Sequence, residues 1–181
     1  MRIRIADIPP EGRELDFELR KESVNARVGS SREPSADATA QGPTYTFLSN
    51  PHVHVRLMLE GSTVVISGNV KGEYVTQCAR CAEDAKRGVS TPLDLVLKPQ
   101  SGRSEDAEDL HFGTYSGEEI ECSDFAEEFL VLSLPFTVLC DDKCKGLCPQ
   151  CGKNLNMGAC DCKPEPTGDP RLSVLRELKI H

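Results

Sequence analysis

The chain has 181 residues, nine cysteines and a formal net charge of −8. This length allows one ordinary hydrophobic core with a small appendage, so we expect one main domain. The first residues lack the apolar run of a secretion signal, and no apolar stretch is long enough to cross a membrane. We therefore expect a cytoplasmic protein with no membrane partner, in which paired thiols stay reduced and serve as metal ligands more readily than as disulfides.

The N-terminal part predicts two short strands and a loop. Apolar and polar residues alternate over residues 2–8, which Pro9 ends, and again over residues 14–20. Residues 29–43 are small, polar and without a pattern, so we expect a mobile loop there.

The next part predicts a long antiparallel hairpin. Residues 52–60 alternate cleanly, and residues 63–77 return after a Gly-Ser turn, with Gly68 and Gly72 as candidate bulges. A further strand follows, with apolar residues at Val89, Leu93, Leu95 and Leu97.

His52 and His54 lie on the polar face of the first of these strands. The simpler interpretation is a pair of half-exposed sheet histidines, because cysteine ligands already abound. The alternative is metal ligation, as in a metal hydrolase.

Residues 99–109 are polar and predict a linker. Residues 110–115 and 118–121 then flank a Ser-Gly pair and predict a small hairpin. At the far end, apolar residues at helical spacing predict a short terminal helix from residue 169 onward.

The one principal helix is predicted after residue 121. Ser123 is expected to cap it, Asp124 and Glu127 suit the positive end of its dipole, and Pro135 ends it. Its core-facing residues recur at helical spacing: Phe125, Phe129 and Leu132, with Ala126 and Leu130 beside them. An acidic face is also expected, from Asp124, Glu127 and Glu128 with Glu118, Glu119 and Glu121.

Acidic residues are concentrated in this part of the chain. Residues 100–134 hold ten acidic residues and one basic residue, and the stretches on either side are nearly balanced. The net charge therefore does not by itself exclude a partner with phosphates, which attract Lys and Arg. The acidic face is most simply solvated surface, and the alternative is a contact for a basic protein.

Six of the nine cysteines lie between residues 140 and 162. Cys148-Pro-Gln-Cys151-Gly has the form of a zinc knuckle, in which two thiolates meet one ion and a glycine turns backbone N–H groups toward sulfur. Cys160 and Cys162 follow after a short turn. One segment can therefore supply a closed site of four thiolates.

Eight cysteines form four close pairs, which permits two zinc ions. In one grouping, Cys78 and Cys81 join Cys140 and Cys144, and the other four hold a second ion. In the rival grouping, Cys144 belongs to the terminal site and the Cys78 pair stays reduced. Sites closed by four cysteines are structural, because no position remains for substrate.

Two other roles for the cysteines are a redox pair and an apolar filler. Cys78 and Cys81 lie between two strands, whereas a thioredoxin-type redox pair would open a helix. Cys122 is expected to be a small apolar filler.

If both sites form, six basic side chains approach one another, at an edge able to meet phosphates without reading bases. These candidate partner-binding residues are Arg80, Lys86, Arg87, Lys143, Lys145 and Lys153.

Together these patterns predict an α+β fold with a mainly antiparallel sheet, one principal helix and a small C-terminal zinc-knuckle module. Residues 1–135 are the expected core domain. Residues 136–181 are the expected Cys-rich module with its terminal helix.

The motifs resemble the YceD family of large ribosomal RNA subunit accumulation proteins. The resemblance rests on Cys78-Ala-Arg-Cys81 after a long strand, on a helix ending Leu-Ser-Leu-Pro135, and on Cys-Lys-Gly-Leu-Cys-Pro-x-Cys-Gly-x-Asn-Leu-Asn before Cys-Asp-Cys162 and Asp169-Pro-Arg. It implies a cytosolic, non-enzymatic factor needed for normal levels of large-subunit ribosomal RNA, encoded beside a small ribosomal protein. No catalytic residue comes with it.

Three functions are therefore compared. The first is a ribosome-biogenesis factor that binds ribosomal RNA or a large-subunit ribosomal protein, without a small-molecule substrate. The second is a protein-only adaptor or chaperone that holds a basic ribosomal protein through residues 105–128. The third is an enzyme, either a redox dithiol at Cys78 and Cys81 or a hydrolase using His52 and His54.

Overall fold

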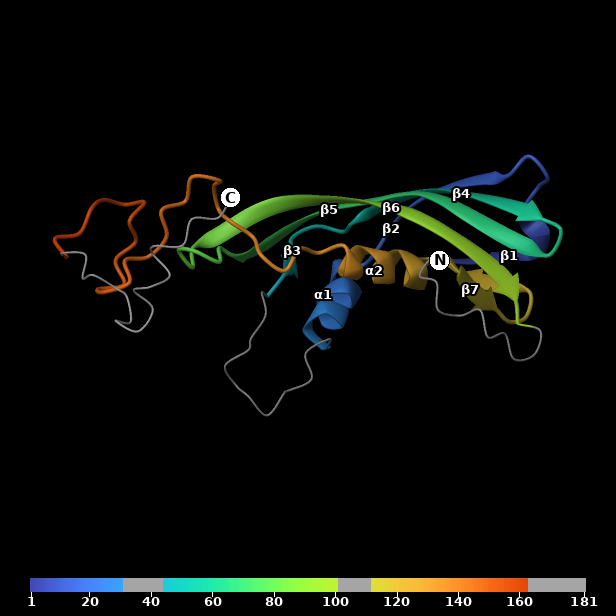
Figure 1. The fold of residues 1–181 in the computed structure, drawn as a ribbon. Helices are drawn as coiled ribbons and strands as arrows, with labels where there is room; N and C mark the ends of the chain where they lie inside the picture. The colour runs from blue at the N-terminus through green and yellow to red at the C-terminus, as the bar shows by residue number, and fades with distance from the viewer. Residues whose placement is uncertain (31–43, 101–111, 163–181) are drawn as a thin grey trace, which may run out of the picture.

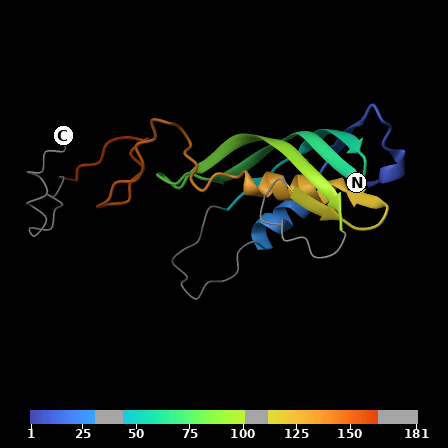
Figure 2. The ribbon, with the colours of Figure 1, turned by 45° about the vertical axis from the view of Figure 1, so that its right-hand side comes forward.

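An arched sheet forms the body of the molecule, and two helices lie against its inner side (Figure 1). The computed structural model describes residues 1–30, 44–100 and 112–162. The Cys-rich segment, residues 140–162, extends from the end of the sheet where β5 passes into β6, as a second view also shows (Figure 2). The predicted α+β class with a mostly antiparallel sheet is confirmed.

The main sheet has the strand order β2, β4, β5, β6 and β7, and β3 pairs with another part of β5. All neighbours are antiparallel except β6 and β7, which are parallel. The strands are β2 Arg13–Glu18, β3 Thr46–Phe47, β4 His52–Glu60, β5 Thr63–Gln77, β6 Asp84–Pro99 and β7 Phe112–Tyr115. A separate two-stranded sheet pairs β1 Arg2–Arg4 with β8 Glu119–Glu121.

The inner face of the sheet carries the hydrophobic core. Alternate residues of β4 and β5 are buried, among them Val53, Leu57 and Ile66, while their neighbours face solvent. The alternation over residues 52–60 and the turn that follows it therefore predicted both strands correctly, with the same bounds.

The bulges expected in β5 are absent, because its register is unbroken on both sides. Gly68 lies opposite Val55, and Gly72 opposite Val89. A Cβ on Gly68 would lie 2.1 Å from the carbonyl oxygen of His54. Glycine is needed there for close approach of two backbones, not for an extra residue in the strand.

Two helices cover the sheet where one was expected. The unpredicted helix is α1, Lys21–Ser30, whose Val24 is fully buried. Its sequence has few apolar residues, so its pattern is weak. The predicted loop over residues 29–43 is therefore wrong at its start, since residues 29 and 30 end α1, and residues 31–43 lie outside the described part of the chain.

The second helix, α2, spans Cys122–Leu132 as expected, but two details differ. Its N-cap residue is Glu121, and Ser123 instead donates a side-chain hydrogen bond to the Glu121 carboxylate. Leu132 is 65% exposed, so it does not belong to the core-facing stripe. The buried face consists of Cys122, Ala126, Glu127 and Leu130.

The predicted hairpin around Gly117 is wrong, although both of its strands exist. β7 pairs in parallel with the end of β6, where Val96 lies opposite Phe112. β8 pairs with β1, where Ile3 lies opposite Ile120. The first predicted strand is also shorter than residues 2–8, because a 3-10 turn, η1 Ile5–Asp7, follows β1.

Two further predictions lie outside the described residues. These are most of the linker at 99–109, of which residues 99 and 100 are described, and the terminal helix from residue 169. Among the helices that the structure describes, none is long and apolar enough to cross a membrane.

Candidate metal centres

The turn between β5 and β6 presents the first pair of thiols. The backbone N–H of Cys78 donates to the Glu83 carbonyl over 2.8 Å, and that of Ala82 donates to the Cys78 carbonyl over 2.9 Å. Ala82 adopts a positive φ of 58°, which closes the turn. The fold thereby holds Cys78 and Cys81 on one side of a tight loop.

The chain that leaves α2 brings the second pair of thiols to the same place. The Ala79 N–H donates to the Val138 carbonyl over 2.8 Å, and the Arg87 guanidinium donates to the Leu139 carbonyl. These contacts place Cys140 directly beside the turn. The first group is thus formed by Cys78, Cys81, Cys140 and Cys144.

The sulfur spacing of the first group fits a metal ion. The Sγ atoms of Cys78 and Cys144 are 3.8 Å apart, and those of Cys81 and Cys140 are 3.5 Å apart. A disulfide would need about 2.05 Å. A tetrahedral zinc with Zn–S bonds of about 2.3 Å separates its sulfurs by about 3.8 Å. The donor set and its spacing therefore suit zinc, which these four cysteines would hold as a structural ion.

The second group lies wholly within the Cys-rich segment. The Sγ atoms of Cys148, Cys151, Cys160 and Cys162 all lie within 4.8 Å of one another. The Cys148 N–H donates to the Lys153 carbonyl, and the Gly152 N–H donates back to the Cys148 carbonyl, each over 2.9 Å. Gly152 has a φ of 71°, which explains the glycine after Cys151.

Both groups contain thiols with a lowered pKa, and in the first group these include Cys144, whose pKa the Asn156 side-chain hydrogen bond lowers. Burial opposes ionisation of Cys78, but backbone N–H groups of Cys140, Arg80 and Cys81 outweigh it and lower the pKa of Cys78 to about 6. Backbone N–H groups of Cys151 and Gln150 likewise lower the pKa of Cys148 to about 6.

Both groups also contain thiols with a raised pKa. Interaction with Cys81 raises the pKa of Cys140 to about 12, and interaction with Cys151 raises that of Cys162 to about 12. Crowded thiolates repel one another, so a nearby divalent cation would favour ionisation of all four.

The grouping of the thiols matches one of the two arrangements left open by the sequence. Cys144 lies with Cys78, not in the terminal group. The first group therefore spans the predicted domain boundary at residue 135. Cys122 belongs to neither group: it is buried, and burial raises its pKa to about 11, as expected of an apolar filler.

The two histidines behave as sheet residues. Asp16 Oδ1 lies 3.0 Å from His54 Nδ1 and 3.8 Å from His52 Nε2. Both imidazoles are about half exposed. Of the part of the chain that the structure describes, only the two cysteine groups bring three or more potential ligands together.

The predicted basic residues are only partly brought together. Arg80 donates to the Cys144 carbonyl over 3.1 Å, and the exposed Lys143 and Lys145 flank that residue. Lys86 instead pairs with Glu73 at 3.0 Å. The two other predicted residues, Arg87 and Lys153, donate to backbone carbonyls of Leu139 and Ala159 respectively.

The acidic face is smaller than predicted. Glu121 pairs with Arg2 at 2.6 Å, Glu119 pairs with Arg4 at 3.6 Å, and Glu127 is buried beside α1. Hydrogen bonds from the N-terminal amine, Arg2 and Ser123 lower the pKa of Glu121 to about 2. The exposed carboxylates of the described part of residues 105–128 include Glu118, Asp124 and Glu128.

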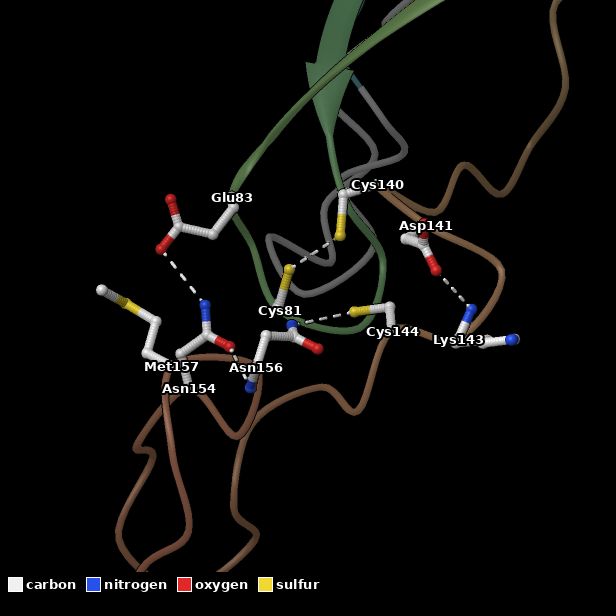
Figure 3. Close-up of a pocket in the computed structure, with 9 residues that line it drawn as sticks. All are labelled: Cys81, Glu83, Cys140, Asp141, Lys143, Cys144, Asn154, Asn156 and Met157. Atoms are coloured by element: carbon white, nitrogen blue, oxygen red, sulfur yellow. Dashed lines mark hydrogen bonds between the residues drawn. The ribbon is translucent and has the colours of Figure 1, made fainter.

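A cavity of about 440 Å³ opens beside the first group (Figure 3). Its walls are Cys81, Glu83, Cys140, Asp141, Lys143, Cys144, Asn154, Asn156 and Met157. The Asn156 side chain donates a hydrogen bond to Cys144 Sγ over 3.3 Å. Sequence reasoning assigned no role to Asn154 or Asn156, although both stand in the Asn-Leu-Asn of the recognised motif.

Comparison with known proteins places these features in context. A family model described as "Large ribosomal RNA subunit accumulation protein YceD" matches residues 66–179. An uncharacterized protein of Mycobacterium tuberculosis is 34% identical over 93 residues, which cover 51% of this chain and 45% of that protein.

Two plant proteins also match, each named "Large ribosomal RNA subunit accumulation protein YCED homolog 1, chloroplastic". The one from Arabidopsis thaliana is 26% identical over 155 residues, covering 69% of this chain and 48% of that protein. The one from Zea mays is 28% identical over 129 residues, covering 55% and 44%. The chain spans about half the length of the curated relatives it matches, and no solved structure matches.

Proposed function

Because the chain belongs to the YceD family of large ribosomal RNA subunit accumulation proteins, we propose that it supports accumulation of large-subunit ribosomal RNA by binding, without catalysing a reaction. It acts in the cytoplasm on ribosomal RNA or on a large-subunit ribosomal protein, and it uses no small-molecule substrate. A role in ribosome biogenesis agrees with the names of the two plant relatives.

The observation that carries a binding role is the pair of four-cysteine groups. A zinc ion enclosed by four thiolates has no open coordination position for water or substrate. Such an ion therefore stabilises the shape of the protein. The first group joins the end of the sheet to the Cys-rich segment and thereby fixes the loop from Cys140 to Cys148.

That loop is the proposed contact for RNA. Positive charge at the junction between the sheet and the Cys-rich segment comes from Arg80, Lys143 and Lys145. The Arg80 guanidinium also donates a hydrogen bond to the loop backbone. Such side chains bind phosphates without reading sequence. The chain has no Trp and three Tyr, so base stacking contributes little.

The test is recovery of the tagged chain from cells with and without ribonuclease. The proposal predicts that large-subunit ribosomal RNA is recovered with the wild-type chain. It also predicts that this RNA is no longer recovered with the double variant Lys143→Glu, Lys145→Glu. Lys71→Glu is the matched control, because Lys71 is an exposed lysine on β5, away from the junction. Equal recovery by both variants would reject this surface.

A second candidate is the protein-only adaptor, which one observation favours. The exposed residues of α2 are Asp124, Glu128 and Leu132, one helical turn apart, and Phe136 beyond the helix is 92% exposed. Two exposed carboxylates on α2, with exposed apolar side chains at and beyond its end, suit a basic segment that carries an apolar residue.

Protein extracted from salt-washed large ribosomal subunits is the probe for this candidate. The adaptor predicts salt-sensitive binding that persists after ribonuclease and is lost in Asp124→Lys with Glu128→Lys. Leu132→Ser with Phe136→Ser should weaken it without unfolding, since both side chains are exposed. Binding that disappears with ribonuclease contradicts the adaptor and supports RNA contact.

A further inference from the structure

The two cysteine groups share a turn that belongs to the second group and contacts the first. Residues 153–157, here called the asparagine turn, lie between Cys151 and Cys160 in the sequence. The Leu155 N–H donates to the Gly146 carbonyl over 2.9 Å, and Asn154 pairs with Leu147 in an isolated bridge. The turn is therefore attached to the loop that carries Cys144.

The side chains of the turn strengthen this attachment (Figure 3). Asn156 donates from Nδ2 to Cys144 Sγ over 3.3 Å and accepts at Oδ1 from the Lys145 N–H over 2.8 Å. Asn154 donates to Glu83 Oε1 over 3.3 Å and accepts from the Asn156 N–H over 3.0 Å. The turn thus links the β5–β6 loop to the Cys144 loop.

The same turn forms one wall of the cavity beside the first group. Cys81, Cys140 and Cys144 line that cavity, and Asn156 lies beside Cys81 with its side chain directed at Cys144. A chelator or an exchanging ligand that enters the cavity meets three of the four thiols. The position of the turn therefore controls access as well as the geometry of Cys144.

Partners in the outer shell of a metal orient its ligands, and their loss typically lowers affinity about 10- to 100-fold. We propose that a metal ion bound by the second group holds the asparagine turn against Cys144 and thereby slows metal loss from the first group. The metal ion of the second group then stabilises metal binding by the first group. This goes beyond the proposed function and stands or falls independently of it.

The experiment uses the full chain loaded with Zn²⁺ and then exposed to excess chelator. Samples are alkylated over time, and mass spectrometry measures modification of each cysteine. In the wild-type chain the second group should be modified first, because its cysteines are less buried than those of the first group. In Cys160→Ser with Cys162→Ser, which lacks the second centre, modification of Cys140 and Cys144 should become about tenfold faster.

Single substitutions in the turn distinguish the effect of the Asn156 hydrogen bond from the effect of losing the second metal ion. Asn156→Ala removes both of its contacts, whereas Asn156→Asp keeps an oxygen for the Lys145 N–H but loses the donor to sulfur. Both should speed modification of the first group and leave the second group unchanged. Met157→Ala is the matched control, because Met157 lines the same cavity but has no side-chain donor.

Amide hydrogen exchange in β4 and β5 shows whether each variant keeps its fold. An unchanged rate at Cys140 and Cys144 in folded Asn156→Ala overturns the proposal. So does an unchanged rate in the double serine variant, or a wild-type chain that takes up no Zn²⁺.

Discussion

The sulfur atoms of Cys78 and Cys144 lie 3.8 Å apart, although 66 residues separate them in the sequence. Between them the chain completes β6, β7, β8 and α2. A metal ion at this point would therefore connect parts of the fold that are distant along the chain, and its removal affects how the Cys-rich segment meets the sheet.

Metal content is the first prediction. The purified, reduced chain should contain two equivalents of zinc, because the described residues form two separate groups of four thiols whose sulfurs lie within 4.8 Å of one another. Chelation should then make the eight clustered thiols reactive and leave Cys122 protected by burial. One equivalent would contradict the two-centre structure, and plasma emission spectrometry measures the number directly.

Gly68→Ala should destabilise the fold by about 3 kcal/mol, because a Cβ there would overlap the backbone of β4. The measurement is urea unfolding followed by circular dichroism. Gly88→Ala is the control, since the atom nearest to its Cβ would be 3.9 Å away. A mild effect at Gly68 would mean that β4 and β5 can separate there at little cost.

Glu127→Ala should cost about 2 kcal/mol in the free energy of unfolding. The Glu127 carboxylate is buried, accepts from Ser23 Oγ over 3.1 Å and pairs with Arg27 at 3.4 Å, so it links α2 to α1. The exposed neighbour Glu128 provides the control, and Glu128→Ala should change little. Equal costs at the two positions would show that the link between the helices has no energetic weight.

The free energy of unfolding should depend on pH in the alkaline range, because the Cys122 thiol is buried. Its pKa is about 11 in the folded chain and about 8.5 in an unfolded one. Since the folded pKa is raised, the stabilisation is complete below about pH 8.5 and is lost as pH rises toward about 11, by roughly 3 kcal/mol.

Cys122→Ala isolates this effect, because alanine does not titrate. The wild-type chain should lose stability relative to the variant across that pH window, measured by urea unfolding at each pH. Parallel curves for the two proteins would mean that the Cys122 thiol is hydrated in the folded state.

The features predicted correctly from the sequence are those with a strong local pattern. Strand β4 has clean alternation and β5 follows it after a Gly-Ser turn, and the bounds of both were correct. The grouping of Cys148 with Cys162 followed from spacing within one segment. The grouping of Cys78 with Cys140 was one of two arrangements that the number of ligands left open, and the structure matches it.

The features missed depend on contacts between distant residues. The pattern of α1 is weak, and its burial of Val24 depends on packing against α2 and β3. A turn at Gly117 suits a hairpin equally well, but Ile120 pairs with Ile3 instead. Asn156 has no pattern of its own, and only the fold brings it to Cys144.

The pairing of β1 with β8 sets an order on folding during translation. Arg2 is made 119 residues before its partner Glu121, whereas β4 and β5 can pair as soon as residue 77 has emerged. Contacts between nearby residues form sooner than contacts between distant ones. During synthesis, β1 therefore stays without its partner strand, and Ile3 without its cover, until residue 121 has left the ribosome.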